Sequence, residues 1–270
     1  MRTVFFISDR TGITAEAFGN SLLTQFNDIE FKRVNIAFID SLSKAKHAAN
    51  QVKKASEADG QPALIFSTQI SKEYRQLLIN SGGIFFDFFE TFISKLEETL
   101  GTKSSQTVGL FHSMTNENNY GNRIDSINFA LSCDDGLNIK NYNRADIILT
   151  GVSRSGKTPT CLFLALQYGI FAANYPLIEE DLQTIKLPTI LQKNKNKLFG
   201  LSINPVRLQN IRDERRSNSD YASIDQCRKE VKLAEDMFVQ NQVPFLDTSH
   251  TSIEEIAGRI LNKSSIKRRY

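Results

Sequence analysis

Short apolar runs alternate with stretches of helical periodicity through the first hundred residues. The pattern predicts strands at 3–8, 34–39 and 62–67, and helices at 14–26, 41–58 and 71–81. An alternation of this kind is typical of βαβ units on a parallel sheet. Gly82 and Gly83 end the third helix, and residues 84–100 predict a strand that runs into a helix. Phenylalanines crowd this last segment, which favours a core-facing element over the alternative, a contact between subunits of a homo-oligomer.

The second half of the chain predicts a further α/β domain. Residues 101–106 contain no large apolar side chain, so the domain boundary is placed there, between residues 1–102 and 103–270. Beyond it the pattern predicts helices at 123–132, 204–216, 222–240 and 252–261, a loop at 133–136, and strands at 145–150, 198–203 and 244–246. The predicted fold class is α/β, with a parallel-sheet N-terminal domain followed by a C-terminal domain that carries a phosphate-binding loop (P-loop).

Composition narrows the functional classes. The chain has 270 residues, of which 40% are hydrophobic and 23% charged, so it is neither disordered nor collagen-like. A net charge of +3 is too small to indicate nucleic-acid binding by itself. The first apolar run is too short for a signal peptide, and no run approaches the roughly 18 residues of a membrane span. Three irregularly spaced cysteines suit neither a disulfide framework nor a paired zinc motif. We therefore expect a cytoplasmic protein with no membrane or nucleic-acid partner.

The most specific motif is GVSRSGKT at residues 151–158, which satisfies the P-loop pattern G-x-x-x-x-G-K-[ST]. An apolar strand precedes it and an apolar helix follows it, as the motif requires. Its glycines let backbone N–H groups turn toward a phosphate, and the start of the helix adds the positive end of its dipole. The expected nucleotide-binding residues are Gly151, Val152, Ser153, Arg154, Ser155, Gly156, Lys157 and Thr158.

Two of these side chains have expected chemical roles. Lys157 is expected to reach the transferring phosphoryl group, and the hydroxyl of Thr158 to ligate Mg²⁺. The alternative is a glycine turn that merely joins strand to helix, but such a turn has no need of Arg154 and Lys157 around its second glycine. The chain has no obvious hydrophobic strand ending in a metal-binding Asp downstream of the loop, and it lacks the protein-kinase motifs. An ordinary P-loop ATPase and a eukaryotic-type kinase are both poor fits.

Two acidic turns are further candidates for chemistry. Asp134 and Asp135, followed by Gly136, could hold Mg²⁺ or accept a proton from an attacking hydroxyl; an ordinary turn is the alternative. Asp9 lies in a hydroxyl-rich turn directly after the first strand, where parallel sheets place ligand sites. A helix cap by Thr11 or Thr14 is the alternative there.

A basic stretch crosses two predicted helices near the C-terminal end. Its residues are Arg207, Arg212, Arg215 and Arg216, with Arg228 and Lys229 nearby on the second helix. A solvated helix face is the default interpretation, although arginine is also the residue best suited to bidentate phosphate recognition.

With these residues assembled, the chain resembles the bacterial regulatory proteins of pyruvate, phosphate dikinase and phosphoenolpyruvate synthase. The similarity covers nearly the whole length and includes ISDRTGITAE (7–16), RIDSINFALSCDDG (123–136), ADIILTGVSRSGKTPTCLFLA (145–165), AANYPL (172–177) and KLFGLSINPVRL (197–208). The segment RDERRSNSDYAS (212–223) makes the synthase branch the closer of the two.

This resemblance implies two opposed activities on one target. Members of the family phosphorylate a threonine of the target enzyme with ADP as donor, and they remove that phosphate by attack of inorganic phosphate, which releases pyrophosphate. The chain is thus expected to use ADP, inorganic phosphate and Mg²⁺, to act on phosphoenolpyruvate synthase, and to use Lys157, Asp134, Asp135 and Asp9 as catalytic residues.

Two departures from the family pattern bear on this expectation. The family commonly reads Ser-Asp-Gly-Thr where this chain has Arg10, and His-Asp-Asp-Gly where it has Cys133. A role of that histidine cannot be carried over to this chain. Two alternatives therefore stay open: a non-catalytic, nucleotide-responsive protein that binds the same target, and a P-loop kinase of a small molecule.

Overall fold

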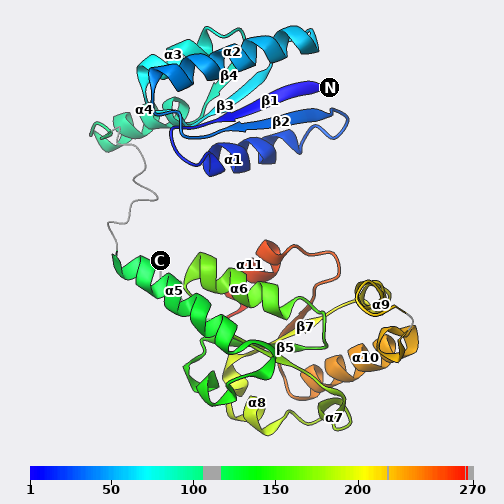
Figure 1. Ribbon diagram of the computed structural model, residues 1–270. Coiled ribbons are helices and arrows are strands. Elements are labelled where there is room, and N and C mark those ends of the chain that lie inside the picture. Colours follow the sequence, from blue (N-terminus) through cyan, green and yellow to red (C-terminus); the bar gives the residue numbers. More distant parts are fainter. Residues whose placement is uncertain (106–116, 218, 265, 267–270) are drawn as a thin grey trace. The chain divides into compact units, whose positions relative to one another are not determined.

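A computed structural model describes residues 1–105, 117–217, 219–264 and 266. The chain divides into two compact units, residues 1–113 and 114–270, which are described separately (Figure 1). The predicted domain boundary after residue 102 stays a prediction, because residues 106–116 lie outside the described part. Within that part, no helix is both long and apolar enough to cross a membrane.

The N-terminal unit is a four-stranded parallel sheet covered by helices. Its elements are β1 (Arg2–Ile7), α1 (Ile13–Leu23), β2 (Phe31–Ile36), α2 (Leu42–Asp59), β3 (Leu64–Ser67), α3 (Lys72–Ile79), β4 (Ile84–Asp87) and α4 (Phe88–Leu100). The strand order is β2-β1-β3-β4, and all pairs are parallel. Helix α1 covers one face of the sheet, whereas α2 and α3 cover the other (Figure 1).

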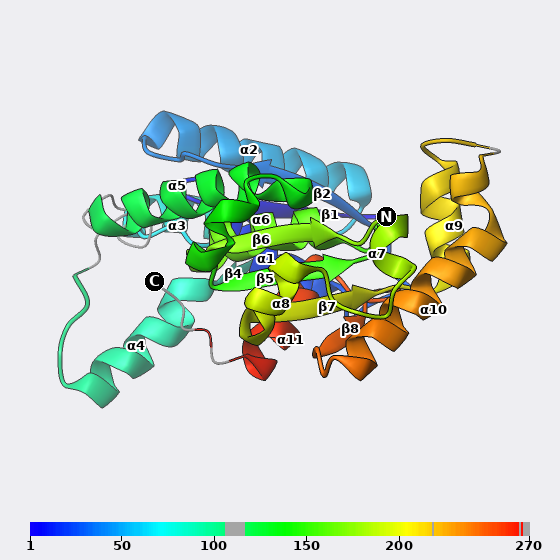
Figure 2. The same ribbon diagram turned by 90° about the horizontal axis from the view of Figure 1, so that it is seen from below.

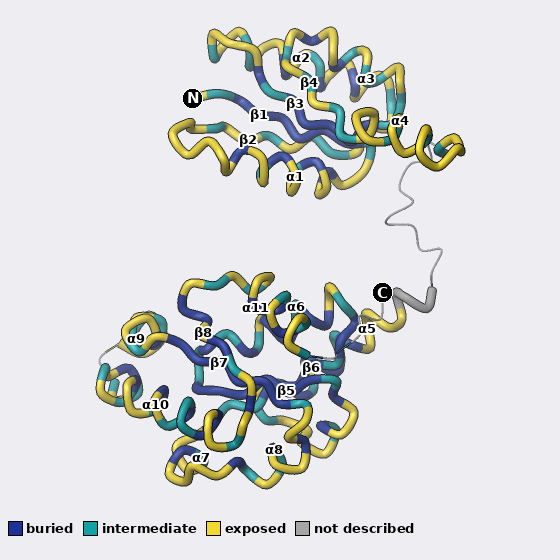
Figure 3. Tube along the Cα trace, turned by 180° about the vertical axis from the view of Figure 1, so that it is seen from behind, coloured by how far each residue is buried: buried dark blue, intermediate teal, exposed yellow. Residues whose placement is uncertain are grey.

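Both faces of β1 are buried, which explains its uninterrupted apolar sequence. Val4 and Phe6 pack with residues of α1, whereas Phe5 and Ile7 pack with residues of α2 and α3. Figure 3 shows the resulting contrast between the buried strands and the exposed outer sides of the helices.

One predicted strand is displaced. The apolar run at 34–39 predicts a strand there, but β2 covers Phe31–Ile36. Phe38 has a positive φ of 57°, and the amide of Ile39 donates to the carbonyl of Ser8, so the chain has already left the strand direction. Ile39 is apolar because it is buried in this loop, not because it continues the strand.

The C-terminal unit is a second parallel sheet, in the order β6-β5-β7-β8. Its helices and strands are α5 (Glu117–Ser132), β5 (Ile147–Gly151), α6 (Lys157–Tyr168), β6 (Ala172–Pro176), α7 (Glu179–Leu182), α8 (Thr189–Lys193), β7 (Leu198–Ser202), α9 (Pro205–Asp213), α10 (Ile224–Gln240), β8 (Phe245–Asp247) and α11 (Ile253–Lys263). Short 3₁₀ turns include η2 (Asp134–Gly136), η3 (Ile139–Arg144), η4 (Lys195–Lys197) and η5 (Asp220–Ala222). Ile147 and Leu149 pack against α6 and α11, whereas Ile148 belongs to the core that includes α10. The predicted α/β fold class is confirmed in both units.

Strand β6 was not expected from the apolar pattern. Its sequence, AANYP, has small and polar residues instead of a run of branched ones. It is nevertheless buried, because it pairs with β5 on one side and receives the η2 turn on the other, where the amide of Asn174 donates to the carbonyl of Cys133. This pairing brings residue 134 to the phosphate loop.

Candidate functional site

The phosphate loop joins β5 to α6 and depends on unusual backbone angles. Gly151 has a φ of 150°, and a Cβ there would lie 2.2 Å from the carbonyl oxygen of Leu201 on β7. Gly156 has a φ of 88° and occupies the N-cap position of α6, where it offers no side chain to the first amides of the helix. These amides have no intrahelical acceptor and are free to bind an anion. Arg154 also has a positive φ, 76°, which an arginine rarely adopts and which marks the loop as strained.

Lys157 begins α6 and is almost completely buried, with 4% of its surface exposed. Its Nζ donates to the carbonyl oxygen of Val152 at 2.8 Å, so it closes the loop upon itself. Burial lowers the pKa of Lys157 to about 8, and the nearby carboxylates of Asp135 and Asp134 oppose this by favouring the ammonium form. The cation is therefore held inside the loop at a high desolvation cost, as expected for a group that an incoming phosphate would stabilise.

Thr158, Asp134 and Asn174 meet at one point beside the loop. The hydroxyl of Thr158 donates to Oδ1 of Asp134 at 2.9 Å, and Nδ2 of Asn174 donates to the same oxygen at 2.6 Å. Asn174 also lies 3.0 Å from the Thr158 hydroxyl and 3.3 Å from Oδ1 of Asp135. The structure thus brings together the predicted loop and the predicted acidic pair, although they are far apart in sequence.

Asn174 is the residue that sequence reasoning missed. It is buried in β6, beside the strand that precedes the loop, and its Oδ1 has no hydrogen-bond partner among the described residues. A carboxamide in this place holds the acidic turn against the loop through side-chain and backbone contacts. The only available signal was a polar residue within an otherwise small and apolar segment.

The two carboxylates of the turn are not equivalent. Asp134 is half-buried and bonded to Thr158 and Asn174, whereas Asp135 is exposed and has a positive φ of 48°. The neighbouring Cys133 points into the hydrophobic core, and burial raises the pKa of its thiol. The thiol is therefore neutral at neutral pH, and it does not take the place of a base.

These residues suit a magnesium ion bound together with phosphates. Mg²⁺ prefers oxygen ligands and is commonly held by one or two carboxylates or hydroxyls, with water and phosphate oxygens completing its shell. Thr158 and Asp134 offer such oxygens side by side. Within the described ranges, no group of three or more histidine, cysteine, aspartate or glutamate side chains is arranged to hold a metal. Thr158 and Asp134 would supply two of the oxygens that Mg²⁺ prefers, and water or phosphate oxygens would supply the others.

The default interpretation of the basic stretch, a solvated helix face, holds for only some of its arginines. Arg207, Arg215 and Arg216 are exposed, as expected for a solvated helix face. Arg212, in contrast, is completely buried: it donates to the carbonyl oxygen of Ser153 at 3.3 Å and pairs with Glu230 at 2.6 Å. Its guanidinium also lies over the ring of Tyr221, and the Tyr221 hydroxyl donates to Oγ of Ser153. This arginine does not face solvent; it stabilises the phosphate loop through its hydrogen bond to Ser153.

Asp9 belongs to the N-terminal unit and follows β1. Burial raises the pKa of Asp9, and its Oδ2 has no partner in the part of the chain that the structure describes. The alternative of a threonine cap is wrong, because Gly12 is the N-cap residue of α1 and no side chain caps the helix. Arg10, at the position where the family pattern differs, is exposed. The proposed catalytic role of Asp9 stays a prediction.

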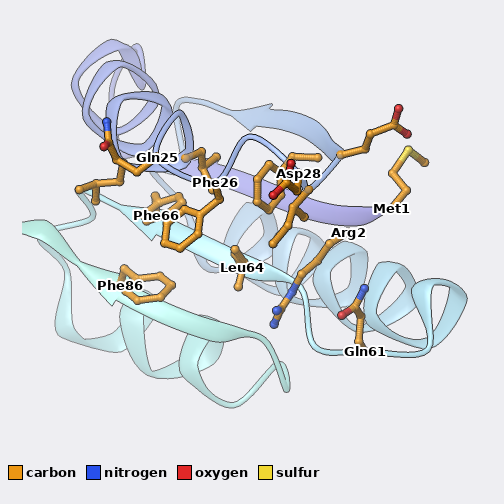
Figure 4. A pocket seen from close by; sticks show the side chains of 14 residues that line it. Met1, Arg2, Gln25, Phe26, Asp28, Gln61, Leu64, Phe66 and Phe86 are labelled. Carbon is orange, nitrogen blue, oxygen red and sulfur yellow. The ribbon is translucent and has the colours of Figure 1, made fainter.

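A pocket of about 740 Å³ lies in the N-terminal unit between the end of α1 and the sheet. Figure 4 shows Phe26, Phe66 and Phe86 along its wall. Its lining is mainly apolar and includes none of the predicted site residues.

Comparison with known proteins shows which family the chain belongs to. The family model described as "Kinase/pyrophosphorylase" matches residues 4–261. The chain belongs to the kinase/pyrophosphorylase family. A relative in Hahella chejuensis is 51% identical over 267 residues, covering 99% of this chain and 98% of the relative. One in Alkalilimnicola ehrlichii is 51% identical over 268 residues, covering 99% and 97%, and one in Pseudomonas aeruginosa PAO1 is 48% identical over 269 residues, covering 100% and 98%.

All three relatives bear the name "putative phosphoenolpyruvate synthase regulatory protein". The family that the sequence resembles is therefore confirmed. Since the similarity is full-length, both units of this chain have counterparts in the family.

Proposed function

We propose that this protein transfers a phosphoryl group from ADP to a threonine of phosphoenolpyruvate synthase, and that it removes the same phosphate with inorganic phosphate. The family description supports a kinase and a pyrophosphorylase activity, and the names of the relatives support the target. The three buried thiols suit the reducing cytoplasm in which we expect it to act.

The observation that carries this proposal is the contact between Thr158 and Asp134 next to a buried Lys157. A loop that only bound a nucleotide would need its amides and its lysine. A half-buried carboxylate held against the threonine of the loop adds the group that positions a metal or a nucleophile. Both proposed reactions move a phosphoryl group between oxygens, so one set of donors serves both.

In the kinase direction, the threonine hydroxyl of the target attacks the β-phosphorus of ADP. A new O–P bond forms, the bond to the bridging oxygen breaks, and AMP leaves. The loop amides and Lys157 stabilise the equatorial oxygens, and Arg212 keeps the loop in place through Ser153. Asp135 is exposed beside the loop and is the carboxylate available to take the hydroxyl proton.

In the opposite direction, an oxygen of inorganic phosphate attacks the phosphorus of phosphothreonine. The bond from phosphorus to the threonine oxygen breaks, pyrophosphate forms, and the threonine oxygen takes up a proton. Thr158 and Asp134 would hold Mg²⁺, whose positive charge would offset the negative charge of the phosphate oxygens in both reactions. Asn174 keeps Asp134 in position for this role.

The decisive experiment is an acceptor assay. Purified protein is incubated with Mg²⁺, phosphoenolpyruvate synthase and ADP labelled at the β-phosphate, and phosphothreonine is measured. Label on the synthase, and its release as pyrophosphate when inorganic phosphate is added, is the expected result. Nucleotide binding without transfer would support a non-catalytic binding protein, and transfer to a metabolite alone would support a small-molecule kinase.

A further inference from the structure

A cavity of about 460 Å³ lies beside Ser153 of the phosphate loop. Ser153 of the loop forms one wall, Ile178 and Glu179 after β6 form another, and Arg212, Asp220 and Tyr221 close it from the α9–α10 region. Helices α9 and α10 pack together, and α7 packs against α10, so the walls belong to one packed group of elements (Figure 2). None of the predicted nucleotide-binding or acidic residues except Ser153 lines this cavity.

The cavity is joined to the loop by hydrogen bonds. The hydroxyl of Tyr221 donates to Oγ of Ser153 at 3.0 Å, and Arg212 donates to the carbonyl oxygen of Ser153. A molecule in the cavity therefore lies beside the loop that binds the phosphates. Direct transfer requires the second substrate to lie next to the bound phosphates, and this cavity borders the loop.

The charges that line the cavity disfavour a phosphate and favour a cation. Arg212 is already neutralised by Glu230, at 2.6 Å. Glu179 and Asp220 line the cavity, are exposed, and have no ion-pair partner among the described residues. Two free carboxylates next to a neutralised arginine give a negative site, which attracts a lysine or arginine side chain.

The buried arginine provides a second indication of a ligand. Arg212 lines the cavity with none of its surface exposed to solvent, and its Nε has no acceptor in the described structure. Buried N–H groups are rarely left without an acceptor, and a backbone carbonyl of a bound polypeptide is a suitable one. Ile178 and Tyr221 add apolar surface for the stem of a long side chain.

From this cavity we infer that the protein binds the acceptor polypeptide through a basic residue close to the phosphorylated threonine, with Glu179 and Asp220 as the partners of that residue. The inference rests on the proposed function, because it presumes a protein acceptor. It adds a substrate preference: a positively charged residue near the threonine.

The test compares the double variant Glu179→Gln/Asp220→Asn with the parent and with Glu180→Gln. Glu180 is an exposed carboxylate on the same short helix that does not line the cavity, so it is the matched control. In steady-state assays the double variant is expected to raise KM for the synthase about three- to tenfold, with kcat and the Kd for ADP unchanged. The control is expected to match the parent.

Salt provides a readout that a purely structural role would not move. The KM of the parent for the synthase should rise with ionic strength, because salt screens the attraction between the basic residue and the two carboxylates. The KM of the double variant should rise less, because it lacks those carboxylates. A raised Kd for ADP with an unchanged KM for the synthase would overturn the inference and assign the cavity to the nucleoside. Unchanged values for both would also overturn it. If the parent itself transfers no phosphate to the synthase, the proposed function fails first.

Discussion

The buried ammonium group of Lys157 leads to a prediction in which stability and ligand binding change in opposite directions. Lys157→Met removes the charge and retains most of the side-chain volume. Both reactions are expected to slow by about 10²–10³-fold, the usual cost of losing one donor to transition-state charge. The fold should remain, because the side chain makes its one described hydrogen bond within the loop, to Val152.

The size of the effect on stability follows from the pKa of Lys157, which is about 8 in the folded protein and ordinarily 10.5. Holding the ammonium form in the folded state at neutral pH therefore costs about 3 kcal/mol. Between pH 8 and pH 10.5 the unfolded chain binds the proton and the folded chain does not, so the stability of the parent rises with pH in this window. The methionine variant lacks this dependence. The variant's advantage in the free energy of unfolding over the parent should therefore shrink by about 2 kcal/mol between pH 7 and pH 9.5.

Denaturant unfolding of both proteins at the two pH values measures this difference, since other titrating groups contribute equally to both. ADP binding supplies a second readout. The parent's Kd for ADP should rise above pH 8, by up to about tenfold per pH unit, whereas the weaker binding of the variant should stay flat. A constant stability difference, together with a constant Kd of the parent up to pH 9.5, would refute the reasoning.

Four further substitutions test other parts of the site. Asn174→Ala should raise the Mg²⁺ concentration needed for half-maximal activity by about tenfold, because Asp134 loses its tether; a kcat loss that Mg²⁺ cannot restore would contradict this. Cys133→Ser should change the rate of phosphothreonine formation by less than about tenfold, whereas Asp135→Asn should cost far more. The reverse order of effects, with folding checked by circular dichroism, would show that the residue at 133 is the important one. Gly151→Ala should destabilise the C-terminal unit by several kcal/mol, visible as a lower Tm, since its methyl group would collide with the Leu201 carbonyl; an unchanged Tm would mean that β5 and β7 can separate at little cost.

Local patterns in the sequence determined most elements of both units and the phosphate loop, although not β6, α7 or α8. The glycines at 151 and 156, the lysine and the flanking apolar segments act over a few residues, so their consequences can be deduced without knowing the fold. The same is true of the alternation of strands and helices, since side-chain periodicity reflects burial on one or both faces. The strand predicted at 34–39 is displaced from β2 because Ile39 is apolar and buried, as a strand residue would be, although it lies in a loop.

Only the tertiary structure decided which side chains meet. Asp134 contacts Thr158 because β6 lies beside β5 and carries the η2 turn along its edge, and strand order depends on packing between distant segments. Asn174 joins the site for the same reason, from a strand whose small and polar residues gave no signal. Arg212 reads as one cation in a solvated stretch, yet packing of α9 on α10 buries it beneath Ser153, where Glu230 balances its charge. Such contacts join residues far apart in the chain, and they exist only once the sheet has formed.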